Sequence, residues 1–286
     1  MIKYNPKTWF SLIFHSYSRQ VVRLLFPALV FMAIYSLLAA YLVLEVFQWN
    51  FKSTTAVHSL LGIVLGLFLV FRVNSAYDRW WEGRKLWGLL VNNSRNLAFK
   101  VASYLPDDHE ARKYFAVMIP NFVVAVKEHL RKGVDLKALD LSEIGVELEG
   151  KEHIPNYISY LLHRKINALY KEGIFTGDHF LVLDAEMKMF SDILGGCERI
   201  KNTPIPYSYS MYIKKFIFTF TITLPFAFIT DFGYLTVPIV LMIFFILVSV
   251  ELIAEEIEDP FGKDVNDLPT EELSTKIKSN VQEILL

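Results

Sequence analysis

The chain alternates between long apolar runs and charged stretches. The first apolar run covers residues 24–46, and the second covers 54–73. Two further runs, 216–230 and 234–254, lie close together towards the C-terminal end. A helix rises about 1.5 Å per residue, so about 20 residues cross a hydrocarbon core of about 30 Å. We therefore predict four transmembrane helices, of which the second and third are short and need cover from neighbouring helices or a water-filled lumen.

The second apolar run continues into charged sequence without a turn signal. Leu60–Phe71 is followed directly by Arg72–Arg84, and no proline separates them. The pattern predicts one unbroken helix that starts in lipid and ends in a polar domain. Such a helix is typical of a pathway or a coupling device.

The long insert at 74–215 shows helical rather than strand periodicity. Its apolar residues recur at spacings of three and four, and no alternating strand pattern occurs. Thr203-Pro-Ile-Pro206 breaks the chain before the third span. We predict an all-α protein with a helical cytoplasmic domain at 74–215, an N-terminal segment at 1–23 and a C-terminal segment at 255–286.

Lysine and arginine placement predicts the orientation. Residues 1–23 carry four basic residues and no acidic one, whereas the link after the first span carries only Lys52. By the positive-inside tendency, the N-terminus is cytoplasmic. Four spans return the C-terminus to the same side, so we expect a multi-pass protein with both termini and the insert in the cytoplasm.

Composition agrees with a membrane part and an aqueous part. Hydrophobic residues make up 53% of the 286 positions and charged residues 21%. The net charge of −1 gives no general attraction for nucleic acid, so we expect no such partner. Cys197 is the single cysteine, which excludes an internal disulfide framework and indicates a buried small residue.

Enzyme motifs are absent from the sequence. It contains no G-x-S-x-G, P-loop, G-x-G-x-x-G or H-E-x-x-H pattern. The seven histidines are scattered, and we expect surface or capping roles for them rather than metal ligation. The protein is therefore not expected to be an enzyme.

One apolar stripe stands out on the second span. Ile63, Leu67 and Phe71 recur every four residues and so lie along one helix face. The stripe can pack against another helix. It can also face a symmetry axis, where copies would form apolar rings that gate ions by dewetting.

Two motifs give the chain a family resemblance. Arg79-Trp80-Trp81 after the pore-like helix resembles the bestrophin family of ion channels, as does Asp259-Pro260-Phe261-Gly262 after the fourth span. The similarity extends over nearly the whole chain and looks like the bacterial branch.

The resemblance implies a homopentamer with one central pore in a bacterial inner membrane. Counted back from Arg79, the neck positions implied by the family fall on Ile63, Leu67 and Phe71. The cytoplasmic aperture is expected at Ile205, between two prolines. The implied partners are the other protomers, the lipid bilayer and small monovalent ions. The resemblance slightly favours cations such as sodium, with chloride as the alternative.

The resemblance also implies a calcium clasp, at Asp264 and Asp267. Lys263, Val265 and Asn266 depart from the acidic family pattern and leave few of the negative oxygen ligands that Ca²⁺ prefers. We therefore expect no cofactor.

Two other classes of protein remain as alternatives. A non-conducting membrane scaffold would bind a partner protein through its cytoplasmic helices. A membrane-embedded carrier or enzyme would need an ionisable pair near the bilayer midplane or an inverted repeat, and neither is visible.

Overall fold

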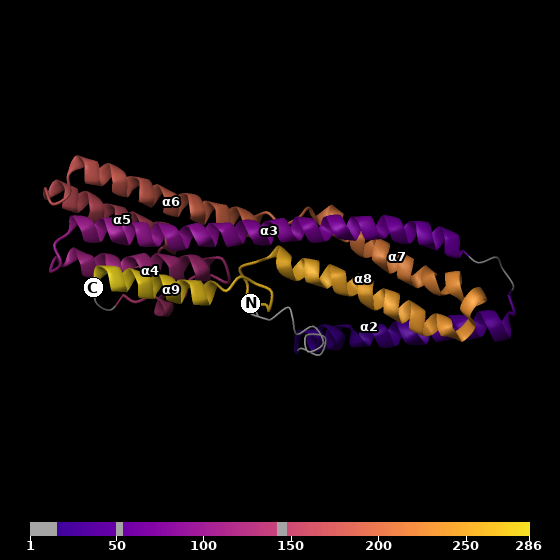
Figure 1. The fold of residues 1–286 in the computed structure, drawn as a ribbon. Coiled ribbons are helices and arrows are strands. Elements are labelled where there is room, and N and C mark those ends of the chain that lie inside the picture. The colour runs from indigo at the N-terminus through magenta and orange to yellow at the C-terminus, as the bar shows by residue number, and fades with distance from the viewer. Residues whose placement is uncertain (1–15, 50–53, 142–147) are drawn as a thin grey trace, which may run out of the picture. The chain divides into compact units, whose positions relative to one another are not determined.

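The computed structural model describes residues 16–49, 54–141 and 148–286, and every regular element in these ranges is helical (Figure 1). The predicted all-α class is confirmed for these residues. Most of the predicted N-terminal segment, 1–23, lies outside them. The long helices are α2 (Ser16–Tyr41, extended by a π-helical turn at Leu42–Val46), α3 (Thr55–Tyr104), α4 (Ala111–His129), α5 (Ile154–Lys171), α6 (Gly177–Asn202), α7 (Tyr207–Phe232), α8 (Thr236–Glu258) and α9 (Thr270–Leu285).

Helix boundaries follow the breakers in the sequence. The unbroken helix predicted across Phe71 and Arg72 is confirmed as α3. The proline-rich break is confirmed too, because α6 ends at Asn202 and α7 begins at Tyr207. Gly233 has a φ of +55°, which side chains disfavour, and it ends α7 before a short 3-10 turn leads into α8.

The chain forms two units. We call Arg79–Thr203 together with Asp259–Leu286 the bundle unit. The described residues up to Asp78, together with Pro204–Glu258, form the apolar unit. Helix α3 contributes its first part to the apolar unit and the remainder to the bundle unit.

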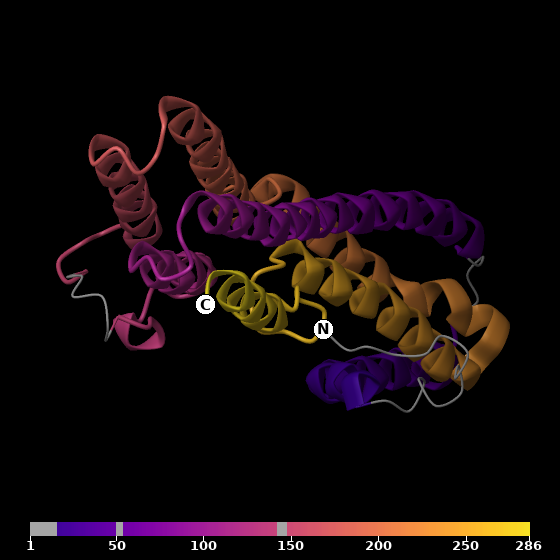
Figure 2. The same ribbon diagram turned by 60° about the vertical axis from the view of Figure 1, so that its left-hand side comes forward.

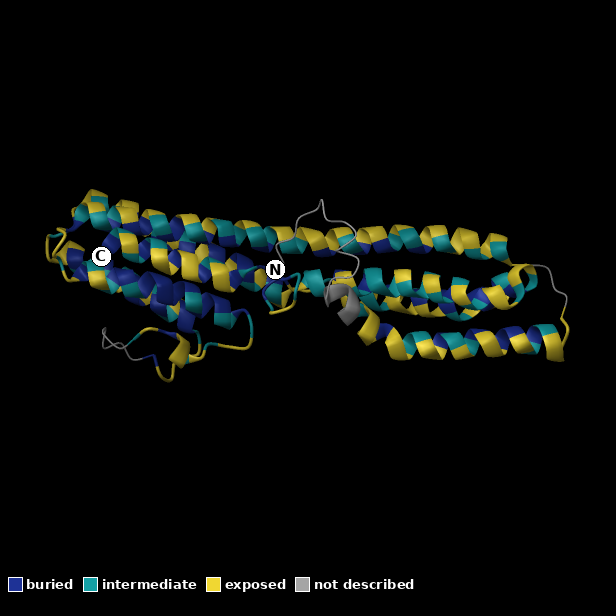
Figure 3. Cartoon of the chain, turned by 60° about the horizontal axis from the view of Figure 1, so that its bottom comes forward, coloured by how far each residue is buried: buried dark blue, intermediate teal, exposed yellow. Residues whose placement is uncertain are grey.

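The apolar unit contains the helices that suit a membrane. Three described stretches are long and apolar enough to cross one, namely Val21–Val46, Thr55–Tyr104 and Tyr207–Glu258. The last of these contains both α7 and α8. Their inner faces share a core, while many large apolar residues remain exposed along the same helices (Figure 3). Exposed apolar residues of this kind are expected where lipid replaces water as the solvent.

The bundle unit has its own hydrophobic core. Helices α4, α5, α6 and α9 and the second part of α3 contribute to it, with Trp87, Phe115 and Phe190 fully buried. Cys197 lies in this core as expected, and burial raises the pKa of its thiol to about 12, helped by Glu198 and Glu82. A thiol held this far from ionisation is a packing residue.

Helix α9 was not predicted. It lies beside α4 in the bundle unit (Figure 2). It buries a stripe at three- and four-residue spacing, made of Thr270, Ser274, Ile277, Val281 and Leu285. The stripe is inconspicuous in the sequence because two of its five members, Thr270 and Ser274, are small polar residues.

Candidate functional site

The predicted apolar stripe lies on an uncovered face of α3. Ile63, Leu67 and Phe71 are 65%, 56% and 61% exposed, so no helix in the described part of the protomer covers them. On the other side of α3, Leu65 and Leu69 are buried in the core of the apolar unit. The stripe is thus available to whatever lies outside the protomer: lipid, another copy or a pore.

The arginine that follows the stripe is buried, although it stands at the start of the charged stretch. Arg72 is 1% exposed, and its Nε lies 3.4 Å from Glu251 Oε1. Its Nη2 lies 2.7 Å from Glu258 Oε2. Both glutamates are on α8, so one guanidinium holds α3 to α8 directly beside Phe71. The sequence alone did not reveal these contacts. The available signal was an arginine at the end of one apolar run and several glutamates at the end of another.

The same ion-pair network reaches the predicted aperture residue. Ile205 lies in the four-residue link between α6 and α7, between Pro204 and Pro206, and it is half-buried. Its backbone N–H donates to Glu258 Oε1 over 2.8 Å. Glu258 therefore binds Arg72 with one oxygen and the Ile205 backbone with the other.

Replacing Ile205 with alanine should change single-channel conductance or ion preference by about threefold, equivalent to less than about 1 kcal/mol of barrier. The shorter side chain would widen and wet the constriction expected at this position, whereas the backbone bond to Glu258 is kept. Planar-bilayer recording measures both properties, with Ile205→Val as the matched control. If Ile205→Ala leaves conductance and reversal potential unchanged, the aperture lies elsewhere.

The Arg79-Trp80-Trp81 motif ties helices of the bundle unit together. Arg79 donates to the backbone oxygens of Thr203 and, over 2.6 Å, of Ile200. These carbonyls close the C-terminal end of α6, where a cation is favoured. Trp80 Nε1 donates to the backbone oxygen of Asn266 over 2.9 Å, and the Trp81 ring stacks at 6.4 Å from that of Trp80. At these contacts the motif has a structural role.

The second motif, Asp259 to Gly262, packs against the first. Asp259 forms an ion pair with Lys201 at 2.5 Å. Phe261 is buried against Gly83, where any Cβ would come within 3.2 Å of its ring and of Pro260. A side chain at position 83 would make Phe261 and Pro260 shift by a few tenths of an ångström, so Gly83 lets the two motifs pack closely.

Arg131 of the loop after α4 fixes the chain that follows Phe261. Its Nε donates to the Phe261 backbone oxygen over 3.2 Å and its Nη2 to Thr270 Oγ1 over 3.0 Å. Its Nη1 pairs with Glu271 at 2.6 Å. Hydrogen bonds from Lys127 and Arg131 lower the pKa of the Glu271 carboxyl, which keeps this end of α9 charged and paired.

The expected calcium clasp lies in the loop before α9, where acidic and basic side chains meet. Asp267 is buried, and its Oδ2 accepts the Asp264 N–H over 2.6 Å, so this carboxylate closes its own loop. At Gly262 a Cβ would lie 2.5 Å from the same oxygen. The adjoining pocket of about 420 Å³ is also lined by the cations Arg131 and Lys263. Calcium takes six to eight oxygen ligands. Here Asp267 is bonded within its own loop, and Glu271, another carboxylate lining the pocket, is already paired with Lys127 and Arg131.

Asp264→Ala should leave ion flux unchanged at any calcium concentration, because the wild-type site is expected to respond to none. Flux from proteoliposomes measured with added calcium and with a chelator tests this. A calcium response in the wild type that Asp264→Ala abolishes would establish the clasp.

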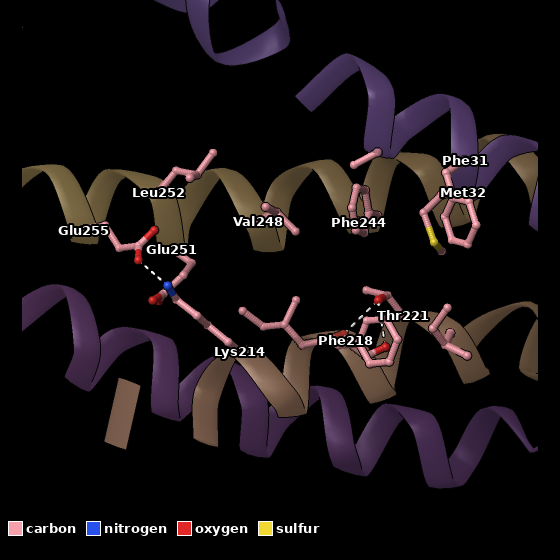
Figure 4. A pocket seen from close by; sticks show the side chains of 13 residues that line it. Phe31, Met32, Lys214, Phe218, Thr221, Phe244, Val248, Glu251, Leu252 and Glu255 are labelled. Carbon is pink, nitrogen blue, oxygen red and sulfur yellow. Dashed lines mark hydrogen bonds and ion pairs between the residues drawn. The ribbon is translucent and has the colours of Figure 1, made fainter. Parts of the chain in front are cut away.

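A further concave feature lies between α2, α7 and α8 (Figure 4). It has a volume of about 340 Å³, and side chains such as Phe31, Phe218 and Val248 line it. The Lys214–Glu255 ion pair closes one end. Because the middle of this pocket is apolar, it suits hydrocarbon and does not provide a path for a hydrated ion.

Comparison with known proteins gives one consistent family. The family model of bacterial and fungal bestrophin proteins matches residues 1–283. A voltage-dependent anion channel-forming protein of Synechocystis is 33% identical, covering 83% of this chain and 80% of the relative. The voltage-dependent anion channel-forming protein YneE of Salmonella typhi is 32% identical, covering 97% and 92%. A crystal structure of a bacterial bestrophin homologue from Klebsiella pneumoniae superimposes with a TM-score of 0.83 at 30% identity, covering 90% of this chain and 97% of that one.

Proposed function

Because the chain belongs to the bacterial and fungal bestrophin family of membrane ion channels, we propose that it assembles as a homopentamer around one ion-conducting pore. The observation that carries the proposal is the uncovered apolar face of α3, which the protomer leaves open along Ile63, Leu67 and Phe71. Members of this family are ion channels and not enzymes, which agrees with the absence of catalytic motifs in the sequence.

The neck of the pore would consist of three apolar rings. Five copies of the stripe, one from each protomer, would surround the axis. Between Ile63 and Phe71 the sequence has no charged residue, so an ion in the neck would lose hydration without a compensating charge. Hydrophobic constrictions gate by such dewetting, and side-chain rotation or a shift of α3 would widen them.

The protomer would cross a bacterial inner membrane four times. The spans would be residues 24–46, 54–73, 216–230 and 234–254. They correspond to α2 with its π-helical turn, the first part of α3, α7, and the 3-10 turn Gly233–Leu235 with α8. Both termini and the domain at 74–215 would be cytoplasmic, as the distribution of basic residues favours. Ions would pass the neck and leave past Ile205.

Anions are the first candidate for the permeant ion. The two curated relatives described above are named anion channel-forming proteins, whereas the sequence resemblance had favoured cations such as sodium. One observation keeps monovalent cations as the second candidate. Asp78 is exposed seven residues after Phe71, hence on the same face of α3, and a ring of carboxylates there would favour cations.

Salt release from liposomes tests the proposed function against a scaffold. Vesicles loaded with KCl and containing the purified protein should lose salt down its gradient, whereas protein-free vesicles retain it. A pentamer of correct size that releases no salt would instead support the non-conducting scaffold.

A further inference from the structure

Two histidines and a glutamate that are far apart in the sequence meet in the bundle unit. His129 is the last residue of α4, His153 immediately precedes α5, and Glu198 is on α6. Nε2 of His129 lies 2.8 Å from Glu198 Oε1, and Nε2 of His153 lies 2.7 Å from the same oxygen. All three side chains are partly buried, so they are held in place and remain reachable from solvent.

The three groups form a donor set that transition metals use. Their ligand atoms lie within 4.8 Å of one another. Two imidazoles with one carboxylate, leaving a position for water, is a recurrent set for Zn²⁺ and for related divalent metals. The imidazole rings stand 4.5 Å apart at an angle of 45°, so both can direct a nitrogen at one point.

The charge around Glu198 is compatible with a bound cation. In the described part of the chain, no lysine or arginine lies within ion-pair distance of its carboxylate. The adjacent Arg199 is paired with Glu82 at 2.5 Å instead. A partly buried carboxylate that faces only two imidazoles has a negative charge that a divalent metal would neutralise.

We propose that His129, His153 and Glu198 bind one divalent transition-metal ion of the zinc class per protomer. Tetrahedral zinc with bonds of about 2.0–2.1 Å needs ligand atoms about 3.3 Å apart, so the present contacts have to open by about half an ångström through side-chain rotation.

Metal binding would also move a proton on His153. Its Nδ1 accepts the Asn156 N–H over 3.2 Å and caps α5. A metal on Nε2 requires the tautomer with a proton on Nδ1, so the Asn156 N–H would then bond to water, as first-turn donors commonly do. The bound metal would replace this cap by joining the end of α4 and the start of α5 to α6.

Titration of the purified full-length protein with zinc alone tests the site. Isothermal titration calorimetry should show one zinc per protomer. Cobalt bound in its place should give visible ligand-field absorption. His129→Ala and Glu198→Gln should each weaken binding at least about 100-fold, more than the loss of an outer-shell partner usually costs.

Two further variants keep the test specific. His153→Asn removes the metal ligand but retains a favourable helix cap, so the fold of α5 is preserved. His163→Ala is the matched control, because His163 lies 3.7 Å from the single carboxylate of Asp184 and outside the cluster; its zinc binding should equal that of the wild type. The proposal is overturned if the wild type binds no zinc, or if zinc binding survives both His153→Asn and Glu198→Gln.

Discussion

Alanine at Leu67 or Phe71 should raise ion flux through the reconstituted protein by on the order of tenfold, which corresponds to a barrier lower by about 1.4 kcal/mol. Each substitution removes an apolar side chain from five positions of the proposed neck at once. The constriction becomes wider and holds water more readily, and an ion loses less hydration in crossing it. Proteoliposome flux at equal protein content measures the change.

Leu61→Ala is the control for these two variants. Leu61 is an exposed apolar residue of the same helix, but six residues before Leu67 place it about 120° around α3. Its replacement should leave flux near the wild-type value. If all three variants conduct like the wild type, the stripe is a packing or lipid-facing surface and the neck must be placed elsewhere.

Arg72→Ala should destabilise the protein by about 3–5 kcal/mol, because it leaves the buried carboxylate of Glu251 and the partly buried one of Glu258 without their cation. The guanidinium is 1% exposed and contacts Glu251 and Glu258, and Glu258 in turn accepts the Ile205 N–H. For a chain of this size the loss corresponds to a fall in unfolding temperature of roughly 10 °C. Thermal unfolding in detergent, followed by circular dichroism, measures it.

Two comparison variants distinguish the loss of a buried ion pair from the loss of an exposed one, and show how much of the loss comes from an uncompensated charge. Lys214→Ala breaks an ion pair with Glu255 whose side chains are 42% and 40% exposed, and such pairs contribute about 0–1 kcal/mol. Arg72→Met combined with Glu251→Gln should recover part of the loss, because the uncompensated charge on Glu251 is removed as well. Equal, small losses for Arg72→Ala and Lys214→Ala would show that the buried network contributes little.

Local patterns predicted most of the helices. The three- and four-residue apolar spacing and the lack of a breaker predicted α3, while Pro204, Pro206 and Gly233 marked the boundaries around α7. Helix formation and helix ends depend on residues that are close in the sequence, so a single sequence is enough to predict them. The exposure of Ile63, Leu67 and Phe71 is compatible with the predicted neck but does not identify what faces it.

Long-range contacts could not be predicted in the same way. Arg72 looked like the start of a solvated helix, because its partners Glu251 and Glu258 lie about 180 residues later. The capping role expected for the histidines holds for His153 and His179. Their scatter in the sequence concealed that His129 and His153 meet at Glu198, since 24 and 45 residues separate the three positions and only the packing of α4, α5 and α6 brings them together. The family motifs could be found from their residue patterns, but only the structure shows which residues they contact in the bundle unit.

The reversal potential of the purified protein in a planar bilayer, under a tenfold KCl gradient, tests the central claim most directly. A perfectly selective monovalent channel would reverse at about 59 mV from zero, with a sign set by the charge of the permeant ion. We predict a measurable conductance whose reversal potential is displaced from zero towards the chloride equilibrium potential. Displacement towards the potassium equilibrium potential would show that the channel prefers cations and would point to Asp78 as the selecting residue. A correctly assembled protein that carries no current would contradict the proposal that it is a channel.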